Sequence, residues 1–534
     1  MTLPPPPSGD TPGSPAFRAT IPESSGLIFE HPARAVLALI GAFLVLRLLL
    51  AATLGLGVDE TYTLANARDL SLSYFDHPPL HYWLIHFTVP VLGEGRAARL
   101  PFILLFAGSS WLLFALTRHL FGAQAGVWAV LALNLSAFFT LSGGGLVPDG
   151  PLQFFLLAAA LVLARGLFPA GDPHSPWTTW LYAGLWLGLA GLSKYHAALF
   201  ALGLIIYLVS VPARRPLLRH PAPWVGALIA LIGVSPALIW NMQHQWVSLA
   251  FQTGRGLPQG LRVGQVFANI AGQMAWILPW IFVPLVIAAW GALRAGRGAE
   301  RSWYCLCLAL PAISIFTIVP LWGSRGLPHW QMPGWLLLYP VLGAYLARAA
   351  VKGWPRRWAI TSAAVLVGLI FIIVGHAATG LGRVWFPGLL AKDPTLEALE
   401  WTPLRDELQA RGLLDRPELF VVVPHWITAG KIDHALGDAL PVVVFGQDQR
   451  HFAFRHDPAL FLGRDALIMG RADDIEEDLP ALRTHFERIE ELPPFAFGRS
   501  GLRELETRIL LGRTLKSPLP AAYGRAITSS AIAN

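Results

Sequence analysis

Acidic side chains are rare in the first 380 residues, and most of those that occur gather in one short stretch. This part of the chain holds 11 of the 33 acids, and five of them fall between residues 59 and 94. These five are Asp59, Glu60, Asp69, Asp76 and Glu94. A carboxylate beside apolar segments is costly unless it is solvated, paired or functional, and a positioned carboxylate can take a proton from a hydroxyl nucleophile. The clustering therefore indicates a site for acid–base chemistry, although a solvated loop that keeps some charge would also explain it.

Four further segments carry polar side chains among apolar and aromatic ones. Asp149 lies in "GGGLVPDGP". Lys194, in "GLSKYHA", is either a lysine that reaches water from a helix end or a point charge for a phosphate. The segments "WNMQHQWVSLAFQTGRG" and "SRGLPHWQMPGW" add His244, Gln252, Arg255, Arg325 and His329. Aromatic belts at membrane boundaries explain the tryptophans, and any one of these histidines alone is more often structural. Together these residues predict one polar site.

The stretch "YFDHPPLHYW" places Asp76 and His77 directly before a pair of prolines. Proline is favoured in the first turn of a helix, so Pro78 and Pro79 are expected to begin one and to fix Asp76 and His77 at its rim. Asp76, His77 and His244 are candidate metal ligands, but no metal-ligand spacing motif occurs in the sequence. We therefore expect Asp76 and His77 to set the selectivity of the site for its ligand or for a divalent cation, with no cofactor certain.

The elements that carry these side chains are predicted to cross a membrane. Hydrophobic residues make up 54% of the chain, charged residues make up 14%, and the mean hydropathy is +0.51, which excludes an ordinary soluble protein. Apolar runs of about 18 residues or more predict transmembrane helices. Eleven such segments lie near residues 33–56, 97–120, 122–142, 151–168, 177–193, 195–212, 222–240, 265–293, 302–322, 332–350 and 358–380. The net charge of +7 comes with arginines scattered between these segments, so it indicates a membrane protein and no nucleic-acid partner.

The charges of the loops predict the orientation of the chain. With the N-terminus in the cytoplasm, the loops on that side hold 14 Lys and Arg residues and the opposite loops hold seven. Positive residues favour the cytoplasmic side, so "VDETY" and "YFDHPP" are predicted to lie on the outer face. The predicted organisation is a disordered cytoplasmic tail over residues 1–30 and a transmembrane catalytic domain over residues 31–380, with a first outer loop at 57–96.

The last 154 residues differ in character and are predicted to form a separate α/β domain. They contain the other 22 acids, and "LFVVV", "PVVVF" and "ALIMG" are typical of short buried strands between helical stretches. An odd number of spans puts residues 381–534 on the outer, periplasmic side. The predicted fold class is a multi-spanning α-helical membrane protein with a small C-terminal α/β domain outside.

Several motifs, taken in order, resemble those of a known enzyme family. The resemblance rests on "VDETY" after the first apolar run and on "YFDHPPLHYW", "VPDGPLQF", "GLSKYHA", "WNMQHQWVSLAFQ" and "LPHWQMPGW". Together these segments resemble the loops of integral-membrane glycosyltransferases with a GT-C fold, over about residues 33–350. The pattern is similar to family 39 in bacteria. That group comprises polyprenyl-phosphate-sugar transferases similar to protein O-mannosyltransferases and to the lipid A aminoarabinose transferases.

This resemblance implies a reaction and a role for each candidate residue. The reaction would move a sugar from a polyprenyl-phosphate carrier to a periplasmic acceptor, such as lipid A, lipopolysaccharide core or another cell-envelope glycan. Asp59 matches the first-loop acid of the family and is expected to act as base, with Glu60 beside it. Lys194 matches a phosphate-contacting lysine, and Arg255 and Arg325 are expected to assist it. The remaining candidates for sugar or acceptor binding are Asp76, His77, Asp149, His244, Gln252 and His329.

Alternatives to this interpretation concern the sugar, the acceptor and the class of protein. The aminoarabinose transferases have an acid–lysine pair where this chain has Asp76 and His77, which argues against transfer of that same sugar. A protein hydroxyl is an alternative acceptor, and a lipid-linked sugar transporter or flippase is a competing class. A transporter is expected to show internal repeats and polar residues near the membrane midplane, whereas here no repeat occurs and the polar residues crowd one face. We therefore expect a multi-pass enzyme of the bacterial inner membrane, in contact with membrane lipids.

Overall fold

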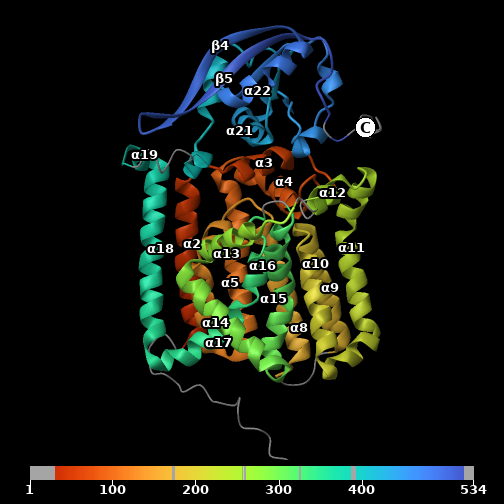
Figure 1. The fold of residues 1–534 in the computed structure, drawn as a ribbon, viewed down its shortest axis with the longest axis vertical. Coiled ribbons are helices and arrows are strands. Elements are labelled where there is room, and N and C mark those ends of the chain that lie inside the picture. The colour runs from red at the N-terminus through yellow and green to blue at the C-terminus, as the bar shows by residue number, and fades with distance from the viewer. Residues whose placement is uncertain are drawn as a thin grey trace, which may run out of the picture.

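The computed structural model describes residues 31–170, 175–254, 257, 260–323, 326–385, 393–521 and 523. Over this part of the chain, long helices run side by side as a bundle, and a domain built on a β-sheet sits on one end of the bundle (Figure 1). The tail predicted at residues 1–30 lies outside the described residues. The predicted fold class, a helical membrane protein with a small C-terminal sheet domain, is confirmed.

Seven helices in the described part of the chain are long and apolar enough to cross a membrane. They are α2 (Pro32–Thr53), α5 (Leu100–Phe121), α8 (Asp149–Leu167), α11 (Pro221–Gln243), α14 (Pro279–Ala295), α15 (Glu300–Ile318) and α18 (Trp354–Thr379). An eighth would be the bent pair of α10 (Ala197–Ser210) and η2 (Pro212–Arg219), whose axes differ by 115°. The bundle also contains α6 (Ala123–Leu135), α7 (Ala137–Ser142), α9 (Pro176–Ser193), α13 (Val263–Ile277), α16 (Met332–Leu336) and α17 (Tyr339–Ala349). The count of eleven spans therefore stays a prediction.

One segment that hydropathy predicts as a single span is interrupted. Residues 265–293 form parts of two helices, α13 and α14, which meet at Leu278. The φ of Leu278 is 79°, in the left-handed region that ends a helix. Pro279 follows directly, and a proline disfavours the α conformation in the residue before it. The chain therefore turns at Leu278, a position that hydropathy averaged along the segment does not reveal.

Helices of the bundle approach closely at glycines. A Cβ on Gly184 of α9 would lie 2.2 Å from the backbone oxygen of Gly226 in α11, so the two backbones touch. Small residues allow such close packing between helices in a membrane, where lipid removes the usual hydrophobic driving force. This contact holds α9 against α11, and Lys194 caps the C-terminal end of α9.

The first loop, residues 57–96, forms short helices that lie across the end of the bundle beneath the C-terminal domain (Figure 1). The elements between α2 and α5 are α3 (Val58–Ala67), α4 (Leu80–Leu92) and η1 (Arg96–Arg99). As the sequence predicts, α4 begins directly after Pro78 and Pro79. Asp76 and His77 therefore lie just before its first turn.

The C-terminal domain contains a mixed five-stranded sheet in the order β2-β1-β3-β5-β4. β1 is parallel to β2 and β3, whereas β5 is antiparallel to β3 and β4. The strands are β1 (Phe420–Val423), β2 (Val442–Val444), β3 (Ala466–Arg471), β4 (Phe486–Arg499) and β5 (Leu502–Leu515). The first three correspond to the predicted strands, and the long β4–β5 hairpin was not predicted. The helices and turns of the C-terminal domain include η6 (Pro394–Ala398), α20 (Pro403–Ala410), α21 (Trp426–Leu436), η8 (Arg450–Phe454) and α22 (Ala472–His485).

The first loop and the C-terminal domain share one hydrophobic core. Leu56 and Tyr62 are buried in the same apolar cluster as Val421 of β1 and Ile432 of α21. Gly430 allows α21 to lie directly on α3, because a Cβ there would come within 2.9 Å of the backbone nitrogen of Tyr62. The domain is therefore packed into the end of the bundle, and its residues can contribute to a site at the junction.

Candidate active site

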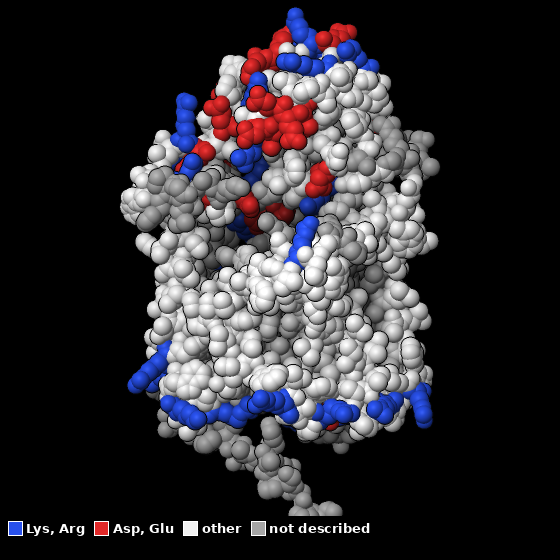
Figure 2. Space-filling model, in the orientation of Figure 1, with Lys and Arg blue, Asp and Glu red and all other residues white. Residues whose placement is uncertain are grey.

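A cavity of about 990 Å³ lies where the bundle, the first loop and the C-terminal domain meet. Figure 2 shows a hollow below the C-terminal domain in which acidic and basic atoms gather. Its walls come from α2, α3, α8, α10 and α12 (Val247–Gly254) and, on the side of the C-terminal domain, from η6, α21 and η8. The predicted site residues on these walls are Asp59, Glu60, Asp76, His77, Asp149, Lys194, Gln252 and His329.

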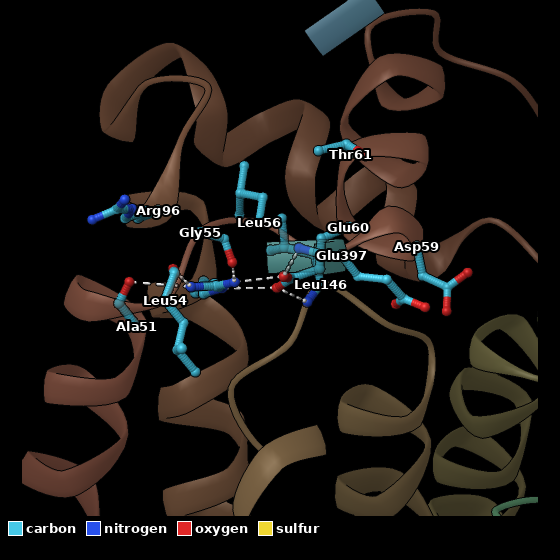
Figure 3. A network of polar contacts seen from close by, with 12 residues as sticks. Ala51, Leu54, Gly55, Leu56, Asp59, Glu60, Thr61, Arg96, Leu146 and Glu397 are labelled. Carbon is cyan, nitrogen blue, oxygen red and sulfur yellow. Dashed lines mark hydrogen bonds and ion pairs between the residues drawn. The ribbon is translucent and has the colours of Figure 1, made fainter. Parts of the chain in front are cut away.

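Two adjacent carboxylates at the start of α3 point to different sides of the helix. Both lie in the first turn, where the helix dipole favours negative charge. The amide of Gly57, the N-cap residue, donates to Oε2 of Glu60 at 2.8 Å and so satisfies a group that the start of the helix leaves unpaired. Figure 3 shows the side chain of Asp59 directed away from the contacts that surround Glu60. The local capping of α3 thus separates the environments of the two acids.

Glu60 is held on both carboxylate oxygens. Arg99 donates from Nε to Oε1 at 2.8 Å and from Nη2 to Oε2 at 2.5 Å, and the amide of Leu146 donates to Oε1 at 3.2 Å (Figure 3). Burial opposes the ionisation of Glu60, but the hydrogen bonds and charge of Arg99 outweigh it and hold its pKa below the ordinary value. A carboxylate held in this way is a weak base, and its contacts fix the turn that carries Asp59.

Asp59 faces the water of the cavity, and none of the cations that the structure describes forms an ion pair with it. Its pKa is raised to about 6. Removal from bulk water is the first cause, and repulsion by the charge of Asp76 is the second. Arg450 opposes the shift, while Glu397 and Glu60 add to it. A carboxyl group with a pKa closer to neutrality is a stronger proton acceptor than an ordinary aspartate.

Asp76 is buried and joins four elements of the structure. Its Oδ1 accepts hydrogen bonds from the hydroxyl groups of Tyr62 in α3 and Tyr82 in α4, both at 3.1 Å. Its Oδ2 accepts from Nη1 of Arg450 in η8 at 3.2 Å, and its backbone oxygen accepts from Nε2 of Gln252 in α12 at 2.5 Å. Asp76 therefore ties the C-terminal domain to the first loop, and a direct contact between Asp76 and a sugar stays a prediction.

Two predicted site residues from different helices form one buried ion pair. Nζ of Lys194 donates to both carboxylate oxygens of Asp149, at 3.0 and 2.9 Å, and both side chains are buried. Lys194 caps the end of α9, and Asp149 is the first residue of α8, so the pair joins two helix ends at the cavity. An ammonium group has three N–H donors, so this pair leaves one donor for a phosphate oxygen.

The three candidate histidines have different positions. His77 and His329 line the cavity, whereas His244 is not part of its wall. The ring of His244 stacks on that of Trp240, with ring centres 4.1 Å apart, and its Nδ1 lies 2.8 Å from the carbonyl oxygen of Trp240. His244 therefore does not share the cavity wall with Asp76 and His77, the other candidate metal ligands. Within the described residues, no group of three His, Cys, Asp or Glu side chains that could hold a metal occurs.

The cations of the cavity differ from those that the sequence suggested. Arg255 and Arg325, the predicted partners of Lys194, lie outside the described residues. Arg47 of α2 lines the cavity, and its guanidinium donates to the carbonyl oxygens of Phe43 and Phe139, both at 3.2 Å. Arg47 could have been found from "LVLRLLLA", because a charge inside an apolar span is a functional candidate by default.

Residues of the C-terminal domain also line the cavity and were not predicted. They are Pro394, Glu397, Ala398, Trp426 and Arg450. The guanidinium of Arg450 lies 4.1 Å from the centre of the Trp426 ring, and its φ of 51° is uncommon for a residue other than glycine. Such a backbone persists only where surrounding structure requires it. No local motif marks these residues, because their place at the cavity depends on how the domain packs on the bundle.

Part of the chain matches known proteins in sequence. Residues 76–240 match the family model described as dolichyl-phosphate-mannose-protein mannosyltransferase. The lipid A galacturonosyltransferase RgtD of Rhizobium johnstonii is 26% identical in an alignment 275 residues long, which covers 49% of this chain and 54% of that protein. The lipopolysaccharide core galacturonosyltransferase RgtB of the same organism is 23% identical in an alignment 371 residues long, which covers 64% of this chain and 72% of that protein. The match to RgtD thus spans about half of that relative.

Solved structures extend the likeness to nearly the whole chain. ArnT from Cupriavidus metallidurans bound to undecaprenyl phosphate superposes with a TM-score of 0.60 at 17% identity, over 89% of this chain and 97% of that one. Its apo form gives a TM-score of 0.61, again at 17% identity, over 90% and 98%. At this level of identity the likeness shows a shared fold. The resemblance that the motifs predict is thereby confirmed: this chain is an integral membrane protein with the fold of the GT-C glycosyltransferases.

Proposed function

We propose that this chain is a glycosyltransferase that moves a sugar from a polyprenyl-phosphate carrier to a lipid-linked glycan. The observation that carries the proposal is a single cavity lined both by Asp59, a carboxyl group with a pKa near 6, and by Lys194, a buried ammonium group. The names of the two curated relatives and the fold of ArnT support the same class of reaction.

The transfer forms one bond and breaks another. The acceptor's hydroxyl oxygen attacks the anomeric carbon of the sugar while the bond from that carbon to a phosphate oxygen breaks. The electron pair of the broken bond stays on the phosphate. Asp59 accepts the proton of the attacking hydroxyl, which its raised pKa favours. Lys194 stabilises the negative charge that develops on the leaving phosphate.

The other predicted site residues would position these two groups or the substrates. Glu60 fixes the first turn of α3, and Asp149 fixes the ammonium group of Lys194. Asp76 and Gln252 hold the loop before α4 in place. The remaining candidates are His77 and His329 for the hydroxyl groups of the substrates, and Arg255 and Arg325 for the donor phosphate.

We place the cavity on the periplasmic side of a bacterial inner membrane. Figure 2 shows a row of Lys and Arg side chains at the end of the bundle opposite the C-terminal domain. The last turns of α5, α8, α14 and α17 carry Arg118, Arg165, Arg294 and Arg348. Positive residues gather on the cytoplasmic side of membrane proteins, so this row supports an outer position for the proposed domain at residues 381–534. The proposed catalytic domain, residues 31–380, would then open outward.

Galacturonate is the sugar that we propose, with lipid A or lipopolysaccharide core as the acceptor. Both curated relatives are named for galacturonosyl transfer, one to lipid A and the other to lipopolysaccharide core. A galacturonate donor carries a carboxylate besides its phosphate. Arg47 and Arg450 contribute guanidinium groups to the cavity wall, and such groups suit both kinds of anion.

A reconstituted assay tests this proposal. The purified chain in lipid nanodiscs receives undecaprenyl-phosphate galacturonate as donor and either lipid A or rough lipopolysaccharide as acceptor. The wild type is expected to add one hexuronic acid, detected by mass spectrometry, and Asp59→Asn is expected to add it at about a hundredth of the rate or less. Transfer of galactose but not of galacturonate would contradict the proposed sugar. Movement of the donor across vesicle membranes without any glycosidic product would contradict the transferase.

A further inference from the structure

A second carboxylate, Glu397, shares the cavity wall with Asp59. It belongs to η6 of the C-terminal domain, and neither the sequence motifs nor the reaction described above uses it. Figure 3 shows the carboxylate of Glu397 beside that of Asp59. Two like charges that come together from distant parts of a chain cost free energy. Their proximity therefore requires a reason outside the stability of the fold.

The backbone of Glu397 is fastened to the segment that precedes Asp59. Nζ of Lys431 in α21 donates to the backbone oxygens of Leu56 and of Glu397, both at 2.5 Å. Lys431 is buried, and its contact with Leu56 lies away from water. Leu56 is three residues before Asp59 in the chain. One lysine thus links the two backbones that carry the two carboxylates.

Further contacts hold η6 in the same position. A Cβ on Gly55 would come within 2.2 Å of the backbone oxygen of Ala398, so η6 lies directly on the chain before α3. Asp393 caps η6 by accepting a hydrogen bond from the amide of Thr395 at 2.9 Å. Its other oxygen accepts from Nη2 of Arg499 at 2.5 Å, which ties the cap to the β4–β5 hairpin. The position of η6 is therefore fixed from both sides.

The side chain of Glu397 differs from that of a nearby glutamate. Glu400 forms an ion pair with Arg96 at 2.8 Å. Glu397 is exposed to the cavity, and in the part of the chain that the structure describes no cation forms an ion pair with it. Its backbone is thus held while its carboxylate stays available, which is the arrangement of a group that binds a ligand.

We infer that Glu397 is an acceptor-binding residue supplied by the C-terminal domain. It accepts a hydrogen bond from a hydroxyl group next to the attacking one and so holds the attacking hydroxyl against Asp59. This inference rests on the proposed function. Two neighbouring carboxylates favour a neutral group rich in hydroxyls and repel a phosphate. The point of attachment is therefore a sugar hydroxyl flanked by another hydroxyl, and not one beside a phosphate.

Three variants test the role of Glu397 in binding. Glu397→Gln removes the charge, Glu397→Asp keeps it, and Glu418→Gln is the matched control on an exposed surface of the same domain, outside the cavity wall. The probes are undecaprenyl-phosphate galacturonate and rough lipopolysaccharide from a strain that lacks the gene. Glu397→Gln is expected to raise the KM for the acceptor by about threefold to tenfold, because the amide oxygen still accepts a hydrogen bond but lacks the charge that strengthens it. The KM for the donor is expected to stay unchanged, and Glu397→Asp is expected to recover part of the loss.

The pH dependence of kcat/KM separates this role from a structural one. The groups that face Asp59 are Asp76 before α4, Arg450 on η8, Glu397 on η6 and Glu60 on α3 itself. Removing the charge of Glu397 lowers the pKa of Asp59, so the acid limb moves to lower pH in Glu397→Gln. The limb is expected to stay in place in Glu397→Asp and Glu418→Gln. None of the three variants is expected to unfold at a lower temperature than the wild type, because Glu397→Gln only relieves the repulsion between two carboxylates.

Two results would overturn this inference. One is a wild-type acceptor KM and a wild-type pH profile in Glu397→Gln. The other is a loss of activity that follows a fall in unfolding temperature and that aspartate does not recover. Asp59→Asn, measured in parallel, keeps the two proposals apart. An active Asp59→Asn contradicts the proposed function, whereas an inactive Asp59→Asn beside a wild-type Glu397→Gln contradicts only the role of Glu397.

Discussion

The two sides of the cavity use charge in different ways. On the side of the bundle, Asp149 and Lys194 are buried and bound to each other at 2.9 Å. On the side that the C-terminal domain closes, Asp59 and Glu397 face water, and no cation among the described residues forms an ion pair with either. A paired charge fixes geometry, whereas an unpaired charge remains free to exchange a proton or a hydrogen bond with a substrate.

Asp59 and Glu60, which are adjacent residues of α3, show the same contrast between an unpaired and a paired carboxylate. Glu60 binds Arg99 at 2.5 Å, and its pKa is held below the ordinary value. Asp59 has no such partner within the described residues, and its pKa is raised to about 6. Removing one member of a buried pair leaves an uncompensated charge, which destabilises the fold. Substitution of a paired carboxylate is therefore expected to destabilise the protein. Substitution of an unpaired one is expected to reduce activity while the protein stays folded.

The largest expected effect is on turnover in Asp59→Asn. Loss of a general base lowers kcat by about 10²- to 10⁴-fold. The amide has nearly the same shape as the carboxylate, so the variant should elute as a folded protein in size-exclusion chromatography. Single-turnover transfer of galacturonate measures the loss. Glu60→Gln is the neighbouring control, and it should yield less folded protein because Arg99 loses its partner. Activity of Asp59→Asn within tenfold of the wild type would contradict the assignment of the base.

Breaking the pair on the other side should mainly affect stability. Lys194→Met leaves Asp149 buried without a partner, and it is expected to lower the free energy of unfolding by about 3–5 kcal/mol. Lys194→Met combined with Asp149→Leu removes both charges and should recover most of that stability. The double variant should still transfer no sugar, because no ammonium group faces the leaving phosphate. Thermal unfolding and turnover of both proteins check this. A stable and active double variant would show that Lys194 has only a structural role.

The site was predictable where its signal is local. The structure places Asp59, Asp76, Asp149 and Lys194 around one cavity, as the sequence predicts. Each could be selected from the sequence because a charge beside apolar segments is costly unless it is paired, solvated or functional. The pairing of these charges was not predictable. Asp149 and Lys194 are 45 residues apart on different helices, and their separate predicted roles did not include a bond between them. Arg47 carries a local signal of the same kind, because it is a charge inside the first apolar run.

The C-terminal domain shows where prediction from sequence stops. β1, β2 and β3 are short runs of apolar residues and were predicted. β4 is an edge strand with few buried positions, and its prolines fall in a register shift between Leu492 and Phe495, where proline is tolerated in a sheet. Such a strand lacks the alternation of apolar and polar residues from which a strand is predicted. Arg450 and Glu397 reach the cavity because the whole domain packs on the first loop, through neighbours such as Ala398 and Phe452 that carry no local pattern predicting that contact.

Removing the charge of Arg450 should shift the pKa of Asp59 in the direction opposite to the shift that removing the charge of Glu397 causes. The charge of Arg450 lowers the pKa of Asp59, so Arg450→Met should raise it and move the acid limb of kcat/KM to higher pH. The shift should be less than about one pH unit, because water in the cavity screens the charge. Arg450→Lys keeps the charge and should leave the limb in place. A limb that stays in place in Arg450→Met as well would mean that Arg450 acts on Asp76 alone.

The smallest expected effect is the decrease in the free energy of unfolding that the ionisation of Asp59 causes. Its pKa is about 6 in the folded protein and near 3.8 ordinarily, so between these values the folded state binds more protons and rising pH favours unfolding. The stability linked to this group is complete below about pH 4 and is lost as the pH rises through about 6. Its size is about 1 kcal/mol, because the carboxylate also contacts water.

Asparagine does not ionise, so Asp59→Asn should unfold at a higher temperature than the wild type at about pH 7.5 and at the same temperature at about pH 4. Glu60 has a lowered pKa, so its ionised form stabilises the fold and that stability is lost as the pH falls. Glu60→Gln should therefore destabilise the protein most near neutral pH. Unfolding temperatures that depend on pH in the same way in both variants would remove the distinction between the paired and the unpaired carboxylate.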